Sequence, residues 1–194
     1  MQLKKSSLLG LTLFLLMALF ASTNVSAAEK DKQPTMDPEN VLYIDIPFGR
    51  VTVVMRPDLA PNHVKRIKEL ARQGFYNDLP FHRVIDRFMA QTGDPKGDGT
   101  GGSGQNLKAE FSKEHHLRGT VSMARAASPD SADSQFFIVL ADSPHLDNSY
   151  TIWGQVVSGM EAVDMIKKGE TFNNGIVNDP TKMLRVQVAA DVKQ

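Results

Sequence analysis

Apolar and polar residues alternate along much of the chain at the spacing of β-strands. Residues 41–46 and 51–55 form two such segments, and Pro47-Phe48-Gly49 between them predicts the turn of a hairpin. Further strands are predicted at residues 81–85, 88–92, 119–123, 134–140 and 151–157, and a last one within 183–192. About eight mostly consecutive strands favour a closed antiparallel barrel, because closure removes exposed sheet edges.

Two stretches show helical spacing instead. Val64, Ile67 and Leu70 recur on one helical face after Pro61, a residue suited to a first turn. A second short helix is predicted over residues 160–168. The pattern therefore predicts a mainly β protein with two helices.

The N-terminal residues have the order of a secretory signal. Lys4 and Lys5 precede an apolar run over residues 8–20, and Val25-Ser26-Ala27 supplies the small residues of a cleavage site. The alternative is a membrane anchor, but this run of 13 residues is shorter than the roughly 20 needed to span a bilayer. We expect residues 1–27 to be a signal peptide that is removed, leaving a secreted, periplasmic protein without stable membrane association.

The rest of the chain is expected to form a polar tether over residues 28–40 and one domain over residues 41–194. Loss of Lys4 and Lys5, with no acidic residue, moves the formal charge from +0 to about −2. The sequence contains no stripe of basic residues, so it does not predict a nucleic-acid partner. We expect the protein to be a monomer. The absence of cysteine excludes disulfides, thiolate catalysis and cysteine-ligated metals.

Several segments match cofactor or catalytic motifs in part, but the surrounding sequence lacks the other residues or elements that these motifs require. Gly97-x-Gly99-x-x-Gly102 matches a dinucleotide fingerprint by letter, but no amphipathic helix follows to bind a phosphate. The same loop lacks calcium ligands at the required spacing, and the five histidines show no metal-binding spacing. His115-His116 is interpreted as a solvated turn. No metal or cofactor is expected, and no serine has the context of a nucleophile.

Residues 81–93, FHRVIDRFMAQTG, contain an unusual cation. Strand alternation places Arg83 on the same side as Phe81 and Ile85, among inward-facing apolar groups. A second apolar run, Phe88-Met89-Ala90, follows the turn. The side chains of Arg83 and Gln91 could therefore share one surface with those of Phe88 and Met89. The loop at residues 93–106 is long and rich in glycine, which in a compact domain indicates function or disorder.

Two later segments could complete a binding surface. Ser122-Met123-Ala124-Arg125-Ala126 ends in small residues, which would let an extended peptide approach the backbone. Gln135 and Phe137 alternate onto one face of the strand at residues 134–140. Taken singly, such aromatic residues are more often core than site.

The segments FHRVIDRFMAQTGDPKGDGTGG, GTVSMARA, SQFFIVL and PHLDNSYTIWGQV resemble the cyclophilin family of peptidyl-prolyl cis-trans isomerases. The resemblance extends over about residues 41–192 and implies a closed eight-stranded antiparallel β-barrel capped by two α-helices. It implies proline-containing polypeptides as substrates and no cofactor. By this resemblance, the catalytic arginine of the family corresponds to Arg83. The residues that form the family's proline pocket correspond to Phe88, Met89, Phe137 and Leu146. The implied peptide contacts are Gln91, Gly99, Ala124, Arg125, Ala126 and Gln135.

The chain departs from the family pattern at three site positions. His145 replaces a tryptophan that is usual in forms that bind cyclosporin tightly, Tyr150 replaces a histidine, and Arg125 replaces an asparagine. His145 and Tyr150 are assigned to the substrate-binding site with the residues above. We therefore expect a cyclosporin-type ligand to bind weakly, while catalysis persists through Arg83. Trp153 is expected in the core.

Two functions remain open at this point. The first is an isomerase that accelerates rotation of X-Pro bonds in exported polypeptides and so assists their folding. The second is a non-catalytic module or chaperone that binds extended peptides on the same barrel. Arg83 and Phe88 favour the enzyme.

Overall fold

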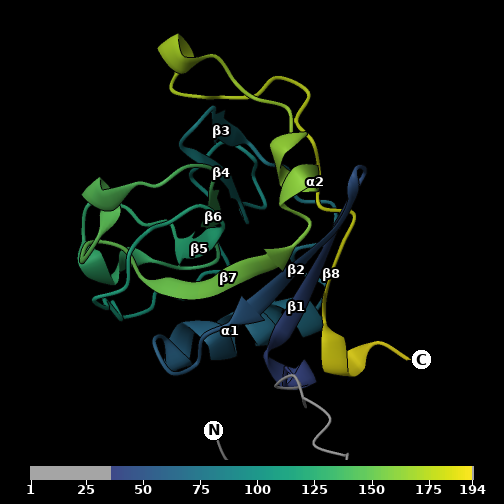
Figure 1. Ribbon diagram of the computed structural model, residues 1–194. Helices are drawn as coiled ribbons and strands as arrows, with labels where there is room; N and C mark the ends of the chain where they lie inside the picture. The colour runs from purple at the N-terminus through teal and green to yellow at the C-terminus, as the bar shows by residue number, and fades with distance from the viewer. Residues whose placement is uncertain (1–35, 194) are drawn as a thin grey trace, which may run out of the picture. The chain divides into compact units, whose positions relative to one another are not determined.

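The computed structural model describes residues 36–193, so the expected signal peptide and most of the expected tether lie outside the described residues. An eight-stranded antiparallel sheet forms its centre, in the order β3-β4-β6-β5-β7-β2-β1-β8 (Figure 1). The predicted eight strands are confirmed. They are β1 (Val41–Ile46), β2 (Gly49–Met55), β3 (Arg83–Ile85), β4 (Met89–Thr92), β5 (Thr120–Met123), β6 (Phe136–Val139), β7 (Ile152–Ser158) and β8 (Arg185–Val188).

The sheet is an open half-barrel, so the prediction of a closed barrel is wrong. β3 and β8 end the strand order at opposite edges and do not pair with one another. Coil between α2 and β8 lies against the β3 side instead, through isolated bridges that pair Pro80 with Lys182 and Arg83 with Ile176. β3 has three residues, and this coil covers its free edge without a continuous ladder.

The described part of the chain contains two α-helices, as predicted. α1 (Pro61–Arg72) begins with proline in its first turn and packs against β8, whereas α2 (Met160–Asp164) packs against β2 (Figure 1). α2 ends before the predicted residue 168, because the N–H groups of Met165 and Ile166 bond three residues back in a tighter turn. The chain then leaves the helix, and the Gly169 N–H reaches the carbonyl of Val84 beside β3.

The ends of the described chain are joined by α1. Pro38–Asn40 falls within the expected tether but forms a 3₁₀ turn, and its Glu39 accepts from Arg72 at 3.0 Å. Arg72 also donates to Asp191 at 2.9 Å. The other 3₁₀ turns are Pro129–Ser131, Pro144–Leu146, Thr171–Asn173 and Ala189–Asp191.

The strands separate two apolar clusters. Phe136 and Ile138 of β6 point into the main core, where Trp153 is fully buried as predicted. Phe137 and Val139, which alternate with them, face the opposite side of the sheet and belong to a second, smaller cluster. That outer cluster also contains Met89 and Leu146 with the partly buried Ile85, Phe88, Ala124 and Tyr150.

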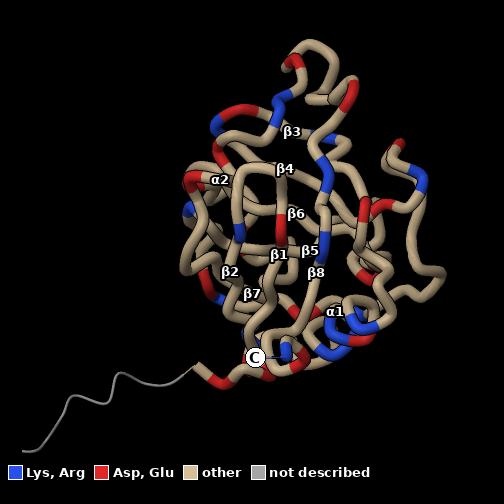
Figure 2. The backbone as a smooth tube through the Cα atoms, turned by 90° about the vertical axis from the view of Figure 1, so that its right-hand side faces the viewer, with Lys and Arg blue, Asp and Glu red and all other residues tan. Residues whose placement is uncertain are grey.

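Charged residues of both signs are interspersed over the face shown in Figure 2. Asp45 of β1 and Arg50 of β2 are register partners, and Arg50 donates to Asp45 at 2.7 Å. Within residues 36–193, no helix is both long and apolar enough to cross a membrane. In the same part of the chain, no three His, Asp or Glu side chains gather as a metal site requires.

Candidate active site

The outer apolar cluster carries a small pocket of about 110 Å³. Its floor and walls come from strands β3, β4 and β6 and from the loops after β5 and β6. Because the main core occupies the other face of these strands, the pocket residues are held in place by the sheet itself. The pocket is lined by Arg83, Phe88, Met89, Gln91, Ala124, Arg125, Phe137, Leu146 and Tyr150.

Arg83 projects from β3 at the edge of this pocket and is fixed by neutral partners. Its Nε donates to the main-chain carbonyl of Asn174 and its Nη2 to the Asn174 side-chain oxygen, each at 3.0 Å. Its Nη1 donates to Gln91 Oε1 at 3.1 Å and lies 3.9 Å from the sulfur of Met89. Burial lowers the pKa of Arg83, and Tyr150 opposes that shift. Three of the five N–H groups thus bond to oxygen, and the others meet no oxygen of a described residue.

Arg83 does not face the main core, which corrects the prediction from alternation. Val84 belongs to the main core, whereas Arg83 and Ile85 point to the outer face. Phe81 precedes β3 and is buried in the main core. Because Phe81 lies outside the strand, strand alternation does not relate the direction of its side chain to that of Arg83. The cation therefore lies on a half-buried outer surface, where a ligand has access.

The turn that holds Arg83 requires an unusual backbone. Asn174 has φ +52°, a left-handed conformation that asparagine tolerates better than most residues. At the following Gly175, with φ +76°, a Cβ atom would collide with Ile85 and with the main chain of Val84. Asparagine followed by glycine thus lets the turn lie close against β3.

A chain of amides leads from Arg83 to the glycine-rich loop. Gln91 of β4 donates to Gln135 at 2.9 Å, and Gln135 donates to the carbonyls of Gly99 at 3.0 Å and Gly101 at 2.8 Å. Because every amide in this chain has its partner, the polar edge of the pocket has one defined arrangement.

Beyond Gln91 and Gln135 lies a larger polar hollow of about 290 Å³. Buried Asp94 shapes its glycine-rich side by accepting from the N–H of Lys96 at 2.8 Å and of Gly99 at 2.6 Å. Burial alone would raise the pKa of Asp94, but these N–H donors hold it below its usual value. The hollow is lined by Gln91, Gly99, Thr100, Gly101, Gly102, Asn106, Ala124, Arg125, Ala126, Ser131, Asp133 and Gln135.

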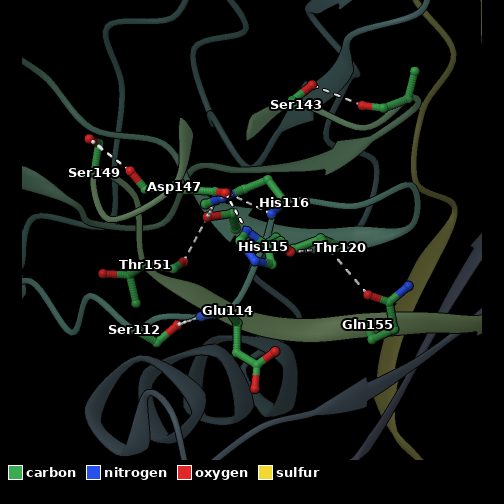
Figure 3. Close-up of polar contacts among 12 residues, drawn as sticks. Ser112, Glu114, His115, His116, Thr120, Ser143, Asp147, Ser149, Thr151 and Gln155 are labelled. Atoms are coloured by element: carbon green, nitrogen blue, oxygen red, sulfur yellow. Dashed lines mark hydrogen bonds and ion pairs between the residues drawn. The ribbon is translucent and has the colours of Figure 1, made fainter. Parts of the chain in front are cut away.

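A histidine and aspartate cluster fastens the loop that supplies the far wall of the pocket (Figure 3). Asp147 accepts from the His116 N–H at 2.8 Å and lies 3.0 Å from His116 Nδ1 and 2.6 Å from His115 Nδ1. His116 Nε2 is 3.0 Å from the Ser122 hydroxyl, which donates to the carbonyl of Thr151. The loop with Leu146 and Tyr150 is therefore tied to the segment before β5.

His116 is 1% exposed, so the interpretation of His115-His116 as a solvated turn is wrong for this residue. Its ring stacks on Phe137 and meets Tyr150 edge-on, directly behind two pocket residues. Burial lowers the pKa of His116 despite the opposing effect of Asp147. His115 is exposed, and its hydrogen bond with Asp147 raises its pKa.

The structure brings together nearly all of the predicted site residues. Arg83, Phe88, Met89, Phe137 and Leu146 line the apolar pocket together with Tyr150, and Gly99, Ala126 and Gln135 line the polar hollow. Gln91, Ala124 and Arg125 line both. His145 lines neither; it is exposed at the rim, with its ring 5.2 Å from that of Phe88.

Three structurally important residues were missed from the sequence. Asn174 holds Arg83 across 91 positions of sequence, and His116 and Asp147 fasten the pocket loop. The Asn173-Asn174-Gly175 sequence signals a turn. No local pattern says that this turn meets β3.

The arrangement suits a reaction without covalent chemistry. An apolar slot lies beside fixed donors on a permanent cation, and no nucleophile with an adjacent base lines the slot among the described residues. Such a site can bind an apolar ring and polarise an amide next to it.

Comparison with known proteins identifies the family of this chain. Residues 41–188 match the family model described as "Cyclophilin type peptidyl-prolyl cis-trans isomerase/CLD". A probable peptidyl-prolyl cis-trans isomerase of Brucella suis is 48% identical over 188 residues, covering 91% of this chain and 95% of that protein. A peptidyl-prolyl cis-trans isomerase of Helicobacter pylori is 46% identical over 119 residues, covering 59% of this chain and 72% of that protein.

Solved structures show the same fold. A cyclophilin from Hirschia baltica superposes with a TM-score of 0.73 at 25% identity, covering 81% of this chain and 77% of that chain. A cyclophilin-type isomerase of Cryptosporidium parvum, solved in the presence of the dipeptide Ala-Pro, gives a TM-score of 0.70 at 25% identity and covers 76% of this chain and 98% of that chain. On the match of sequence and fold, this chain belongs to the cyclophilin family of peptidyl-prolyl cis-trans isomerases.

Proposed function

We propose that Arg83 is the catalytic residue with which this isomerase accelerates rotation of X-Pro peptide bonds. Amide resonance opposes this rotation with a barrier of about 18 to 20 kcal/mol. A hydrogen bond to the proline nitrogen favours the twisted, single-bond geometry, because that geometry returns the lone pair to nitrogen. Such a bond is stronger in the transition state than in either planar isomer, which is the requirement for catalysis.

The observation that carries this proposal is the fixed guanidinium of Arg83 at the edge of the apolar pocket. Asn174 and Gln91 hold it with neutral oxygens, so its position is set while its charge is not neutralised. Its unused N–H groups are available to a substrate amide. Phe88, Met89 and Phe137 offer an apolar surface for the proline ring beside it.

Peptide contacts on either side of the proline are assigned to the polar edge of the site. Gln91 and Gln135 already bond to each other and to the glycine-rich loop, which keeps the polar edge ordered before substrate arrives. Ala124 and Ala126 present small side chains beside it, leaving room for a peptide main chain. Preorganisation of this kind lowers the entropy cost of binding.

The cellular setting is part of the proposal. The basic, apolar and small-residue order of the first 27 residues supports export, so the substrates would be exported polypeptides in the periplasm. We propose a monomer after signal removal. We also propose weak cyclosporin-type binding, since His145 lies at the rim and Tyr150 in the pocket wall.

Exchange spectroscopy by NMR on a blocked Ala-Pro peptide tests this function without a coupling protease. At catalytic protein concentrations, the cis-to-trans exchange rate should rise well above its uncatalysed value, which corresponds to tens of seconds or more. A peptide-binding module without catalysis would shift or broaden the peptide signals and leave that exchange rate unchanged. This second outcome would refute the proposed function.

A further inference from the structure

Two guanidinium groups line the apolar pocket, and neither is paired with a carboxylate of a described residue. Arg83 bonds to amide and carbonyl oxygens, as described above. Among residues 36–193, the partners of the Arg125 side chain are main-chain carbonyls and an aromatic face. The pocket therefore carries two positive charges without a direct counter-charge.

Arg125 is held as firmly as Arg83. Its Nε and Nη2 donate to the carbonyl of Ser149 at 3.1 and 3.0 Å, and its Nη1 donates to the carbonyls of Ala126 at 2.9 Å and Ala127 at 3.1 Å. The guanidinium carbon lies 4.7 Å from the centre of the Tyr150 ring. Ser149 and Tyr150 follow Asp147 in the loop fastened by the histidine cluster (Figure 3). One of the five N–H groups remains for a ligand.

The position of Arg125 matters because it lines both the apolar pocket and the polar hollow. A peptide that places its proline ring in the pocket and runs toward the hollow must pass this residue. Asp133 is the acid among the residues that line the hollow, and its carboxylate is already bonded: it accepts from the N–H groups of Ser103 at 2.9 Å and Gly104 at 2.8 Å, and from the Ser103 hydroxyl. It therefore forms no ion pair with Arg125.

We propose that Arg125 is a specificity-determining residue that makes this isomerase prefer substrates with an acidic side chain directly next to the proline. This inference rests on the proposed function of the same site. A carboxylate beside Arg125 gains a charge-assisted hydrogen bond and meets the second positive charge of Arg83 nearby. A lysine at the same peptide position is repelled by both. Because Arg125 is already held in place, little side-chain entropy is lost when a carboxylate binds.

The expected discrimination follows from typical charge effects. An exposed ion pair alone changes affinity by a factor of about two to five, and a charge-assisted hydrogen bond by about tenfold or more. Between a glutamate and a lysine peptide we expect about tenfold in kcat/KM at low ionic strength, with glutamine between them. Screening should reduce this ratio, since the Debye length falls below about 5 Å at 0.5 M salt.

The test uses blocked proline peptides in two series, with Glu, Gln or Lys directly before or directly after proline, so that this residue carries the peptide's charge. Exchange NMR gives kcat/KM for each peptide with the full mature chain at about 20 mM and about 0.5 M salt. The variants are Arg125→Gln and Arg125→Met, checked for folding by circular dichroism. Arg185→Gln in β8 is the control, because it removes the same charge from an exposed position outside the site.

In at least one series, the wild-type protein should favour Glu over Lys about tenfold at low salt and less than about threefold at high salt. The ratio should fall to about twofold or less in a folded Arg125 variant and stay near tenfold in Arg185→Gln. A wild-type ratio below about twofold in both series would overturn the inference, as would a folded Arg125 variant that keeps the wild-type ratio. Failure to accelerate even the Gln peptides would instead refute the proposed function.

Discussion

Asn174 is predicted to set the rate of isomerisation by positioning Arg83. The substitution Asn174→Gly removes the side-chain oxygen that accepts from Arg83 Nη2 at 3.0 Å. It keeps the main-chain carbonyl that accepts from Arg83 Nε, and glycine adopts φ +52° without strain. The variant thus removes one of the three oxygen contacts of the guanidinium and leaves the turn intact.

The magnitude follows from the contact that is lost. A hydrogen bond from a charged donor contributes about 1.5 to 3 kcal/mol. Because Arg83 keeps its Nε and Nη1 contacts, we expect only about 1 kcal/mol to be lost in the transition state, which lowers the rate about fivefold. Because the guanidinium acts on the twisted amide more than on the planar one, we expect the loss mainly in kcat. KM should change little, since the apolar pocket is untouched.

Exchange NMR at several peptide concentrations separates kcat from KM. Asn148→Gly is the matched control, because Asn148 also has a left-handed φ, of +57°, and its exposed side chain makes no hydrogen bond to Arg83. The control should stay within about twofold of the wild-type protein. A kcat for Asn174→Gly equal to the wild-type value, or an equal loss in Asn148→Gly, would refute the positioning role of Asn174.

Other measurable consequences concern the pocket wall and pH. Phe137→Ala should lower the free energy of unfolding by about 3 to 5 kcal/mol in urea titrations and raise KM, because Phe137 is 5% exposed and forms part of the pocket; an unchanged KM would argue against its contact with proline. The isomerisation rate should vary by less than about twofold between pH 6 and 8, because Arg83 keeps its charge throughout this range even though burial lowers its pKa; a bell-shaped profile would indicate proton transfer by a histidine. On acidification from pH 8 to 6, the two adjacent histidines should change the free energy of unfolding in opposite directions. His115 has a raised pKa, so its contribution is present below about pH 6.5 and is lost as pH rises through the raised value, whereas His116 has a lowered pKa, so its contribution is lost as pH falls below about 6.5. Acidification should therefore stabilise His115→Gln less, and His116→Gln more, than the wild-type protein in urea titrations; the reverse order would contradict these assignments.

Strand periodicity predicted the architecture well because each strand buries one face in the main core. Phe136 and Ile138 alternate with Phe137 and Val139, and both pairs are buried on opposite sides of the sheet. Barrel closure was not predictable in this way. Whether β3 pairs with β8 depends on how the coil around residues 175–183 covers the β3 side, and that coil has no strand pattern.

The site was predicted largely through the family motifs, and the structure corrects its geometry. Alternation from Phe81 placed Arg83 inside the barrel, but Phe81 lies outside the strand and Arg83 faces outward. Asn174 was missed because its contact with Arg83 spans 91 residues. The two adjacent histidines have similar local sequence surroundings, yet one is buried behind Phe137 and the other is exposed. Long-range packing decides such differences.

The proposed mechanism depends on a fixed arginine beside an apolar pocket that accelerates rotation about the X-Pro bond. The most direct measurement compares the exchange rate of a blocked Ala-Pro peptide with equal catalytic concentrations of the wild-type protein and of Arg83→Ala, after circular dichroism shows that both are folded. We predict that the catalysed rate falls at least tenfold, a loss of about 1.4 kcal/mol or more of transition-state stabilisation. Near-wild-type exchange in a folded Arg83→Ala variant would contradict the claim.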